Sequence, residues 1–497
     1  MTKKLIILLL LIGLFLISGF IYWHQSISEV KVSKDVFTDV GRLYPTKIRE
    51  VRSESRVKDL IDVIKDSQEK KLKISISGSR HSQGGHTYYD DAIVLNMRSF
   101  NKIKSLDIEN KTITVESGAT WEEIQDYIAP HGLAVKVMQS SYVFTIGGTM
   151  SANAHGRDLE KTTMVETVQS FRLLQSDGSI INVSRKENSE LFKLVIGGYG
   201  LFGIILDATL ELTNDEIYEK KTLEINYLDF VQYLTDNILT DNTAKMLLIR
   251  PSIDPNSPEF LKNMSVSVWH STNHSDSSLF ELQKEENVLR DKFFFDLSRR
   301  FDWAKSLRWN LQKNIVEKGG QTYVSRNNAM RPPVAPLKLL DYRPDNRTDI
   351  IQEYYIPLDN FAPFMNKFRQ IIKNDNVNII SSTIRYVKAN NEVYWSHTPN
   401  RDALAVIVMS NIPLTRESLI KTEKTTQKLV DATIENNGTH YLTYQLFPTK
   451  EQIRKDYPYT DYVFKQKKNY DKNELFMSKF YERYALDKEI DYYEEYK

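Results

Sequence analysis

Two short glycine-rich stretches constrain this chain more than any other feature of its sequence. The first, at residues 73–86, reads KISISGSRHSQGGH, in which an alternating strand runs into a glycine-rich turn. The second, at residues 145–158, reads TIGGTMSANAHGRD. Glycine reaches positive φ and has no Cβ, so such turns present backbone N–H groups to phosphate oxygens. The pair predicts a bound dinucleotide, with His81 among the polar groups near its pyrophosphate.

The stretch from Gly78 to Gly85 also has a simpler interpretation. Glycine makes flexible connections, and in that case His81 would be a solvated loop residue without a ligand. Both stretches, however, avoid bulky side chains over several consecutive positions, and neither has the pattern of a hairpin turn. The pair therefore favours the cofactor interpretation and leaves the flexible loop as the alternative.

Length and composition exclude several classes of protein. At 497 residues the chain exceeds the size at which one hydrophobic core usually stops growing, so two domains are expected. The formal net charge of +1 gives no reason to expect a nucleic-acid partner and favours small molecules. Because the chain has no cysteine, disulfides, thiolate metal sites, iron–sulfur clusters and cysteine nucleophiles are excluded. We assign no metal to the site.

The first 25 residues differ in kind from the rest. Lys3 and Lys4 precede a run from Leu5 to Trp23 without a charged residue, and its 19 residues approach the roughly 20 that a helix needs to cross a bilayer. A cleaved signal peptide has a shorter apolar region and a small-residue cleavage site, so we prefer an uncleaved single-pass membrane anchor. The two lysines predict a cytoplasmic amino terminus and an extracytoplasmic body.

The N-terminal half mixes helices with strands, some of them antiparallel. The spacing of apolar residues from Val57 to Ile64 predicts an amphipathic helix, and Thr120 with Glu123 forms a capping box at the start of another. An Asp177-Gly178 turn predicts a hairpin. The predicted strands are 74–77, 112–116, 171–174 and 180–183.

Residues 198–203 read GYGLFG and match the glycine fingerprint of a dinucleotide-binding βαβ unit. That fingerprint has to follow a strand and open a helix. Here it follows a predicted helix at 189–195 and opens a predicted strand at 204–213. We therefore do not interpret it as a Rossmann motif.

Glycine becomes rarer after about Asn214, while tyrosine, asparagine and charged residues become more frequent. This shift is typical of a second domain laid over the first. Its clearest predicted strands are 381–387 and 403–409, and no internal repeat is evident.

These motifs, in this order, resemble the FAD-binding oxidoreductases of the vanillyl-alcohol-oxidase superfamily, whose cofactor domain is called PCMH-type. The sugar, polyol and aldonolactone oxidase branch is the most similar, and the resemblance covers residues from about Asp39 to Phe480. It implies an α+β chain in four parts. These are an N-terminal membrane anchor (1–25), a PCMH-type FAD-binding domain (40–215), an α+β substrate or cap domain (216–430) and a C-terminal segment that returns to the FAD domain (431–497).

In that family the first loop, with the form G-x-x-H-S, wraps the FAD pyrophosphate, and the TIGG and NAHG motifs line the flavin. The segment 196–212 resembles the one that closes the FAD domain near the adenine. The resemblance implies these cofactor-binding residues: Gly78, Ser79, Arg80, His81, Ser82, Gly118, Ser140, Thr145, Gly147, Gly148, Ser151, Ala152, His155, Gly156, Gly203 and Ile205. Because many members join a histidine at the position of His81 to the 8α-methyl carbon of FAD, a covalent flavin is expected. For His155 we expect hydrogen bonding or packing.

The family reaction removes hydride from a CH–OH carbon to flavin N5, and oxygen or another acceptor such as a quinone reoxidises the flavin. The protein has to hold that carbon and take up the hydroxyl proton. Arg385 stands where an arginine faces substrate in polyol-oxidising relatives, and the alternative is an outward-facing arginine in a salt bridge. Tyr444 and Gln445 are further candidate catalytic residues, and Tyr444 and His397 are candidate proton acceptors.

The chain departs from the family pattern at two places. Sugar-lactone oxidases tend to carry an H-W-x-K motif near the C-terminal end, whereas residues 440–445 read HYLTYQ and contain no lysine. Polyol oxidases have an acid two residues before the strand arginine, and this chain has Thr383 there. Neither lactone nor simple polyol specificity can be transferred.

Three functions stay open on the sequence. The first is an FAD-dependent alcohol or sugar oxidoreductase held at a membrane. The second is an oxidase of a lipid-linked sugar, similar to decaprenylphosphoryl-ribose oxidase, which an anchor would suit. The third is a non-catalytic flavin-binding module, which the intact glycine loops argue against.

Overall fold

The computed structural model describes residues 12–14, 16–18, 36–285, 288–317, 322–331, 346–486, 490–493 and 496. The predicted anchor at 1–25 lies outside these residues except for 12–14 and 16–18, which are helical. Among the described residues, no helix combines the length and the apolar character needed to cross a membrane. The transmembrane anchor therefore stays a prediction.

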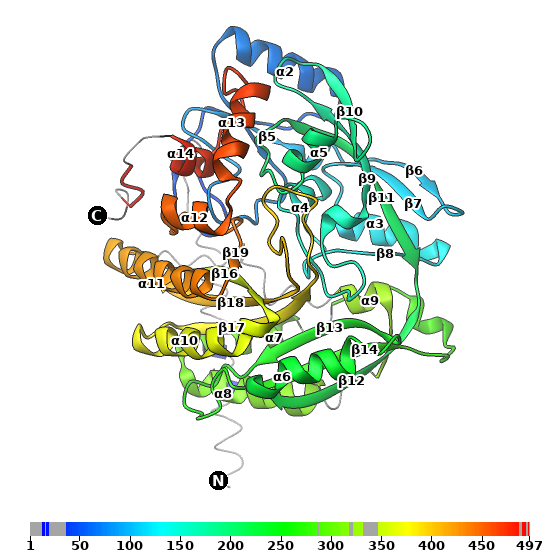
Figure 1. Cartoon of the computed structure of the whole chain (residues 1–497), viewed down its shortest axis with the longest axis vertical. Helices are drawn as coiled ribbons and strands as arrows, with labels where there is room; N and C mark the ends of the chain where they lie inside the picture. Colours follow the sequence, from blue (N-terminus) through cyan, green and yellow to red (C-terminus); the bar gives the residue numbers. More distant parts are fainter. Residues whose placement is uncertain are drawn as a thin grey trace.

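Two main sheets form the N-terminal half of the molecule (Figure 1), preceded by the short antiparallel pair of β1 (Val36–Phe37) and β2 (Thr46–Lys47). In the smaller sheet, β3 (Glu50–Arg52), β5 (Ile93–Asn96) and β4 (Ile74–Ser77) run parallel. The larger sheet is antiparallel, in the order β10-β9-β11-β7-β6, and β8 pairs with the far end of β11. Its strands are β6 (Ile103–Asp107), β7 (Thr112–Glu116), β8 (Leu133–Val135), β9 (Val168–Leu174), β10 (Ile180–Ser184) and β11 (Ile204–Asn214).

Helices cover these sheets and bury the apolar faces that the sequence pattern predicts. Helix α2 (Val57–Glu69) buries Leu60 and Ile64 in a cluster that also contains β4, β5 and β11 residues. Helix α3 (Trp121–Ile128) begins with the predicted capping box of Thr120 and Glu123. Helix α5 (Ser189–Val195) precedes the turn that leads into β11.

The predicted amphipathic helix, capping box, strands and hairpin of this half are confirmed. The segment 198–203 opens β11 rather than a helix, as expected. One interpretation was wrong. The TIGG motif is not a loop but starts the short helix α4 (Ile146–Ser151), because the Thr145 hydroxyl accepts a hydrogen bond from Gly148 N and caps it.

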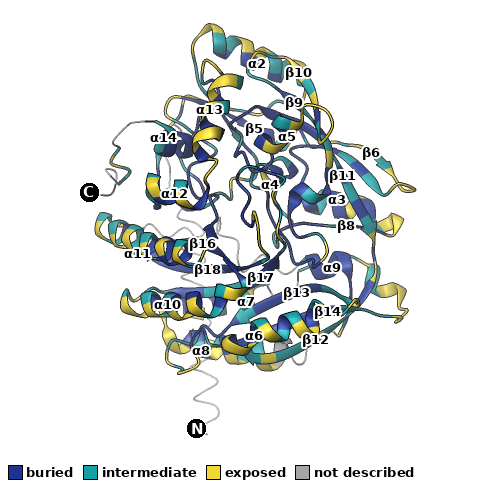
Figure 2. Cartoon of the chain, in the orientation of Figure 1, coloured by how far each residue is buried: buried dark blue, intermediate teal, exposed yellow. Residues whose placement is uncertain are grey.

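A second antiparallel sheet fills the other half, in the order β15-β12-β14-β13-β17-β18-β16-β19. Most residues of its strands β13, β14, β16, β17 and β18 are buried, while the outer faces of the helices beside them are exposed (Figure 2). The two strands predicted in this half, at 381–387 and 403–409, are confirmed and are longer than predicted, as β17 and β18. The strands are β12 (Ile217–Asn226), β13 (Ala244–Pro251), β14 (Asn263–Ser271), β15 (Tyr323–Ser325), β16 (Arg347–Pro357), β17 (Ile379–Val387), β18 (Ala403–Pro413) and β19 (Thr439–His440).

One face of this sheet packs on helices, and the other faces the cofactor half. Tyr354, Ile384 and Val406 lie in the apolar cluster that includes α6 (Tyr227–Tyr233), α10 (Phe361–Asn374) and α11 (Arg416–Glu435). Because side chains alternate along a strand, Glu353 and Arg385 point to the opposite face. Helices α7 (Val288–Arg300) and α8 (Asp302–Leu311) complete this half.

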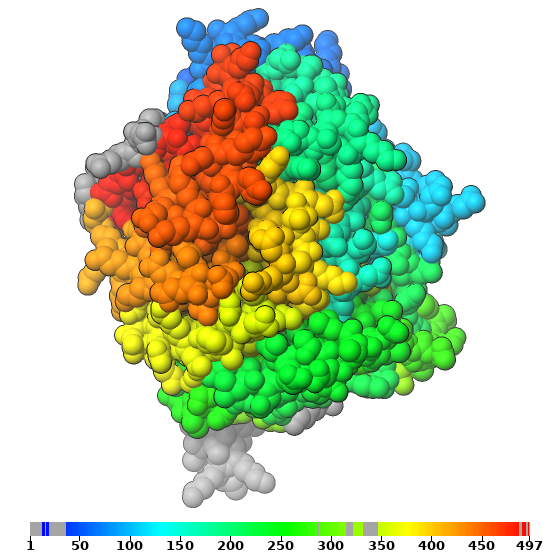
Figure 3. All heavy atoms as spheres, in the orientation of Figure 1, coloured from blue at the N-terminus to red at the C-terminus, as the bar shows by residue number. Residues whose placement is uncertain are grey.

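Residues after Glu435 return to the N-terminal half. They contain α12 (Lys450–Asp456), α13 (Thr460–Tyr470) and α14 (Lys479–Ala485). Ile74 N donates to the Leu475 carbonyl at 2.8 Å, and Met477 N donates to the Ile74 carbonyl at 2.9 Å, so this segment extends the edge of the small sheet. Figure 3 shows its orange and red surface packed against the blue part of the chain.

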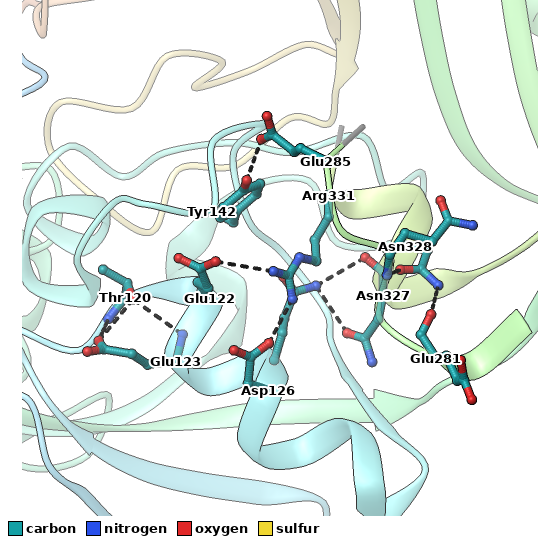
Figure 4. A network of polar contacts seen from close by, with 12 residues as sticks. Thr120, Glu122, Glu123, Asp126, Tyr142, Glu281, Glu285, Asn327, Asn328 and Arg331 are labelled. Atoms are coloured by element: carbon teal, nitrogen blue, oxygen red, sulfur yellow. Dashed lines mark hydrogen bonds and ion pairs between the residues drawn. The ribbon is translucent and has the colours of Figure 1, made fainter. Parts of the chain in front are cut away.

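A polar network joins the two halves beside the second glycine stretch (Figure 4). Arg331, which follows α9 (Arg326–Met330), donates to Asp126 at 2.9 Å on α3, and its guanidinium lies 4.8 Å from the centre of the Tyr142 ring. Gln125 Nε2 donates to the Asn327 carbonyl at 3.1 Å. These contacts hold the segment around Tyr142, which leads into α4, against the second half.

Candidate functional site

The two glycine-rich stretches meet in space. A Cβ on Gly78 would overlap the hydroxyl of Thr145, so only glycine lets the first turn approach the start of α4. Ser79 Oγ donates to the Val143 carbonyl at 2.7 Å, and the His81 ring centre lies 4.3 Å from that of Phe144. Motifs separated by about sixty residues thus form the two sides of one site.

A third glycine turn lies under the second stretch. Gly118 follows β7 and packs so closely on the Met97 and Phe100 carbonyls that a Cβ would clash with both. Gly147 N donates to the Ser117 carbonyl at 2.8 Å, and Ser117 N donates to the Leu206 carbonyl at 2.9 Å on β11. The predicted residues Gly203 and Ile205 stand at the start of that strand, where Gly203 has φ +144°.

The returning C-terminal segment packs against the first turn. Gln83 N donates to the Thr443 carbonyl at 3.0 Å, and His86 Nε2 lies 2.9 Å from the Leu442 carbonyl. Gln445 Nε2 donates to Gln83 Oε1 at 2.6 Å and to the Ile351 carbonyl at 3.1 Å. The Gln445 amide nitrogen therefore holds the first turn against β16, which is a structural contact of a residue that the sequence made a candidate for catalysis.

A buried carboxylate, Glu353 on β16, is the centre of a polar cluster. It is 3% exposed and forms an ion-pair contact with His155 Nε2. The Tyr444 hydroxyl donates to Glu353 Oε2 at 3.3 Å. Arg385 on β17 donates to the His155 carbonyl at 3.3 Å and to Ser140 Oγ at 2.5 Å. The structure thus brings together four residues predicted from the sequence and adds the acid between them.

Aromatic rings surround this cluster. Tyr355 stacks on His397 with ring centres 4.8 Å apart and planes 13° apart, and the Tyr441 ring stands edge-on to both. His397 Nε2 lies 3.1 Å from the Asn153 carbonyl, and the Tyr441 hydroxyl donates to the Ala152 carbonyl at 3.0 Å. These contacts fix the backbone between Ala152 and His155 against the second sheet.

Burial and neighbouring charge set the protonation states. Burial opposes the charged form of Glu353, but the adjacent His155 outweighs it and holds the pKa of the carboxyl below its usual range. Burial and the Glu353 charge raise the pKa of Tyr444 well above its usual range, so its phenol stays protonated. Burial lowers the pKa of His397 to about 4, so this imidazole is neutral at neutral pH.

His81 lies in the first turn with its Nδ1 shielded from solvent. Burial lowers its pKa to about 4, which leaves the imidazole neutral at neutral pH. The neighbouring Arg80 is exposed, has φ +56° and places its guanidinium 4.9 Å from the centre of the Phe37 ring. Arg80 therefore packs on the N-terminal strand β1 (Val36–Phe37).

The remaining predicted residues lie along α4 and its flanks. Gly148 is the third residue of α4, Ser151 is its last, and the Ser151 carbonyl accepts from Tyr199 N at 2.9 Å. Gly156 packs on the Met138 carbonyl, which a Cβ would approach to 2.8 Å. Ser82 follows His81 in the first turn, and its buried Oγ has no partner among the described residues.

Several of the buried polar atoms that lack a partner among the described residues belong to these two places. Each such atom costs free energy unless a ligand or water satisfies it. Among the described residues, one group includes His81 Nδ1, Ser82 Oγ, Thr87 Oγ1 and Ser117 Oγ, and the other includes His155 Nδ1, Tyr355 Oη, Arg385 Nε and His397 Nδ1. FAD fits these positions by chemistry, because it offers phosphate and carbonyl oxygens, hydroxyls and ring nitrogens to both groups.

The sequence analysis missed Glu353 and Ser117. Gln352 and Glu353 interrupt the run IIQEYYI, and a charged residue inside a long buried strand is a signal for a functional group. That Glu353 lies near Arg385 follows only from the pairing of the strands. Glu353 and Thr383 both pair with Ile407, so the acid that Thr383 replaces is present in the same row of the sheet, two strands away.

Comparisons with known proteins identify the class of the N-terminal half. Residues 51–184, about a quarter of the chain, match the family model described as "FAD binding domain". This half is therefore an FAD-binding domain of the PCMH type, with mixed α and β content, and the expected cofactor FAD is confirmed at the level of the domain.

Three relatives illustrate the similarity. Cytokinin dehydrogenase 3 of Arabidopsis thaliana is 30% identical over 43% of this chain and 41% of its own length. Decaprenylphosphoryl-beta-D-ribose oxidase of Mycolicibacterium smegmatis is 28% identical over 35% of this chain and 39% of its own. L-galactono-1,4-lactone dehydrogenase of Arabidopsis thaliana is 28% identical over 42% of this chain and 34% of its own. The chain thus spans about two fifths or less of the length of these curated relatives.

Proposed function

We propose that this protein is an FAD-dependent oxidoreductase that oxidises a CH–OH group of a sugar, polyol or aldonolactone-like substrate. The observation that carries the proposal is the buried Glu353 carboxylate, which accepts a hydrogen bond from Tyr444 beside Arg385 and His155. Such a cluster is costly to bury and has an evident use in moving a proton. The names of the lactone dehydrogenase and the ribose oxidase are consistent with this donor class.

The chain's own residues supply the proton chemistry. When bound, FAD supplies the hydride acceptor. The Tyr444 oxygen takes the proton of the substrate hydroxyl as its own proton passes to Glu353 Oε2, so the phenol ends neutral and the carboxylate ends protonated. Because the pKa of Tyr444 is raised and that of Glu353 is lowered, the carboxylate is the resting base and the phenol the relay. Arg385 orients the substrate.

The test is Glu353→Gln, assayed by anaerobic reduction of the bound flavin with a panel of alditols, aldoses and aldonolactones. Loss of a general base lowers the reduction rate by about 10²- to 10⁴-fold, with flavin content unchanged. The matched control is Glu423→Gln on α11, which removes another largely buried carboxylate. Reduction at the wild-type rate in Glu353→Gln would refute the proton route, and no reduction of the wild type by any donor would refute the proposed function.

We also propose that His81 is joined covalently to FAD. Its lowered pKa keeps the imidazole neutral and nucleophilic, and its Nδ1 is buried without a partner among the described residues. Acid precipitation of the wild type should leave flavin in the pellet, and His81→Ala should release it to the supernatant. Flavin in the wild-type supernatant would exclude the bond.

We further propose that the protein attaches to a membrane, which favours the lipid-linked sugar as a second candidate substrate. Besides the apolar run at residues 5–23, helix α8 exposes Trp303 by 56% and Leu307 by 40%, and Phe301 just before it by 45%. The stretch from Arg290 to Lys313 carries seven basic and three acidic residues, a composition that suits an anionic lipid surface. Val40, near the start of the described body, packs on Phe295 of α7.

Because the chain has no cysteine, a single Leu307→Cys substitution gives a unique site for a spin label. In anionic vesicles the label should become more accessible to oxygen and less accessible to a water-soluble relaxation agent. A label at Leu228→Cys, 59% exposed on α6, is the control and should not change. Equal behaviour of both labels, or no binding of the full chain to vesicles, would contradict the attachment.

A further inference from the structure

Two buried arginines share one hydroxyl at the candidate site. Arg157, which follows the NAHG motif, and Arg385 are each 8% exposed. Arg385 Nη2 donates to Ser140 Oγ at 2.5 Å, and Arg157 Nη2 approaches the same oxygen at 3.5 Å. Arg157 Nη1 donates to the Ala329 carbonyl at 2.9 Å, and its guanidinium lies 5.9 Å from the centre of the Trp269 ring.

The residues around this pair balance only part of its charge, because Glu353 attracts Arg385 but makes no ion pair with it. The nearby carboxylate, Glu353, contacts His155 and Tyr444 rather than either guanidinium. Neither arginine forms an ion pair with another of the residues that the structure describes. Two like charges held together in a buried place are unfavourable unless an anion joins them.

Each arginine also keeps an unused donor. The Nε atoms of Arg157 and Arg385 are both shielded from solvent and have no acceptor among the described residues. Burial and the neighbouring charge of Arg385 lower the pKa of Arg157. The surroundings of Arg157 therefore disfavour its positive charge, and a bound anion would stabilise it. A guanidinium offers its donors in a planar fork that matches the oxygens of a phosphate or a carboxylate.

We propose that Arg157 and Arg385 form an anion subsite that holds a phosphate or carboxylate group of the substrate. The inference rests on the proposed function and deepens it, because it selects acidic or phosphorylated hydroxy compounds over neutral sugars. The anion belongs to the substrate because Arg385 lies with Glu353 and Tyr444, the groups that take the hydroxyl proton. The subsite thereby places the CH–OH carbon at a fixed distance from an acidic group.

The test titrates the FAD-loaded full chain with inorganic phosphate and, separately, with acetate, followed by calorimetry and by the flavin absorption spectrum. Phosphate or acetate should bind saturably to the wild type, and the better probe tells which acidic group the subsite takes. Arg157→Gln removes charge-assisted hydrogen bonds and should weaken binding about ten- to hundredfold. Arg454→Gln, an exposed arginine paired with Asp461, is the control and should bind as the wild type does.

Flavin content is measured in every variant. Equal anion binding by Arg157→Gln and the wild type would overturn the subsite, as would absence of binding in the wild type. Loss of flavin in Arg157→Gln but not in Arg157→Lys would assign the guanidinium to the cofactor and also overturn it. The titration needs no turnover, so a protein that binds phosphate yet oxidises no donor would refute the proposed function and leave the subsite standing.

Discussion

The contact between Gly78 and Thr145 gives the sharpest prediction about the cofactor site. In Gly78→Ala the new Cβ would overlap the Thr145 hydroxyl, which caps α4 through Gly148 N. Displacing the cap costs about 1 kcal/mol, and overpacking adds about 1 to 3 kcal/mol. The free energy of unfolding should therefore fall by about 2 to 4 kcal/mol, and flavin content should fall with it.

Thr145→Ala alone loses the cap and should cost about 1 kcal/mol. The double variant removes the hydroxyl that the new methyl group strikes, so its cost should be about 2 kcal/mol smaller than the sum of the two single costs. Urea unfolding of the four proteins, the wild type, the two single variants and the double variant, measures this coupling. Strictly additive costs would refute the contact between the two glycine stretches.

Three further predictions concern protons and donors. Burial lowers the pKa of His81 to about 4, of His86 to about 3 and of His397 to about 4, and raises that of Asp39 to about 6. On these four groups alone, the unfolded chain binds about two more protons than the folded one between pH 6 and 4, three on imidazoles less one on Asp39. Their contribution lowers the unfolding free energy of the apoprotein by about 3 kcal/mol per pH unit on acidification, and the raised pKa values of Asp215, Asp296, Glu423 and Asp456 offset part of it. A urea midpoint that stays flat or rises on acidification would contradict this prediction. Tyr444→Phe should slow flavin reduction. Tyr354→Phe, the control, makes the same change on the helix-covered face of the second sheet and should not slow it. Equal reduction rates in the two variants would show that Tyr444 does not carry the proton. Gln445→Ala should lower the flavin content but not the reduction rate per flavin, because the Gln445 amide holds Gln83 in the first turn. A normal flavin content with a slower reduction would instead indicate that Gln445 acts on the substrate.

The sequence predicted the local elements of the cofactor half well because each has a local cause. The helical spacing from Val57 to Ile64, the capping box at Thr120 and the turn at Asp177 all act within a few residues. The error at TIGG has a local cause too. The two glycines of this motif are typical of a loop. The Thr145 cap and the packing of Gly147 on Ser117 instead make the segment a helix, α4.

The substrate side could be predicted only in part. Arg385 and Tyr444 were found through resemblance, but their neighbour Glu353 was not, because strand register and not sequence distance brings it to them. The task of Gln445 likewise depends on a contact with Gln83, 362 residues away. Such contacts arise from the pairing of β16, β17 and β18 and from the return of the C-terminal segment, which periodicity along the chain does not specify.

The central claim is that FAD lies where the first turn, Ser117 and the start of α4 meet, with its flavin toward Glu353 and Arg385. A crystal structure of the flavin-loaded protein tests it most directly. We expect density for FAD bounded by residues 78–87 on one side and 145–156 on the other, with the His81 ring at the flavin. Density for the cofactor elsewhere, or a solidly packed interior between these segments in a protein that carries flavin, would contradict it.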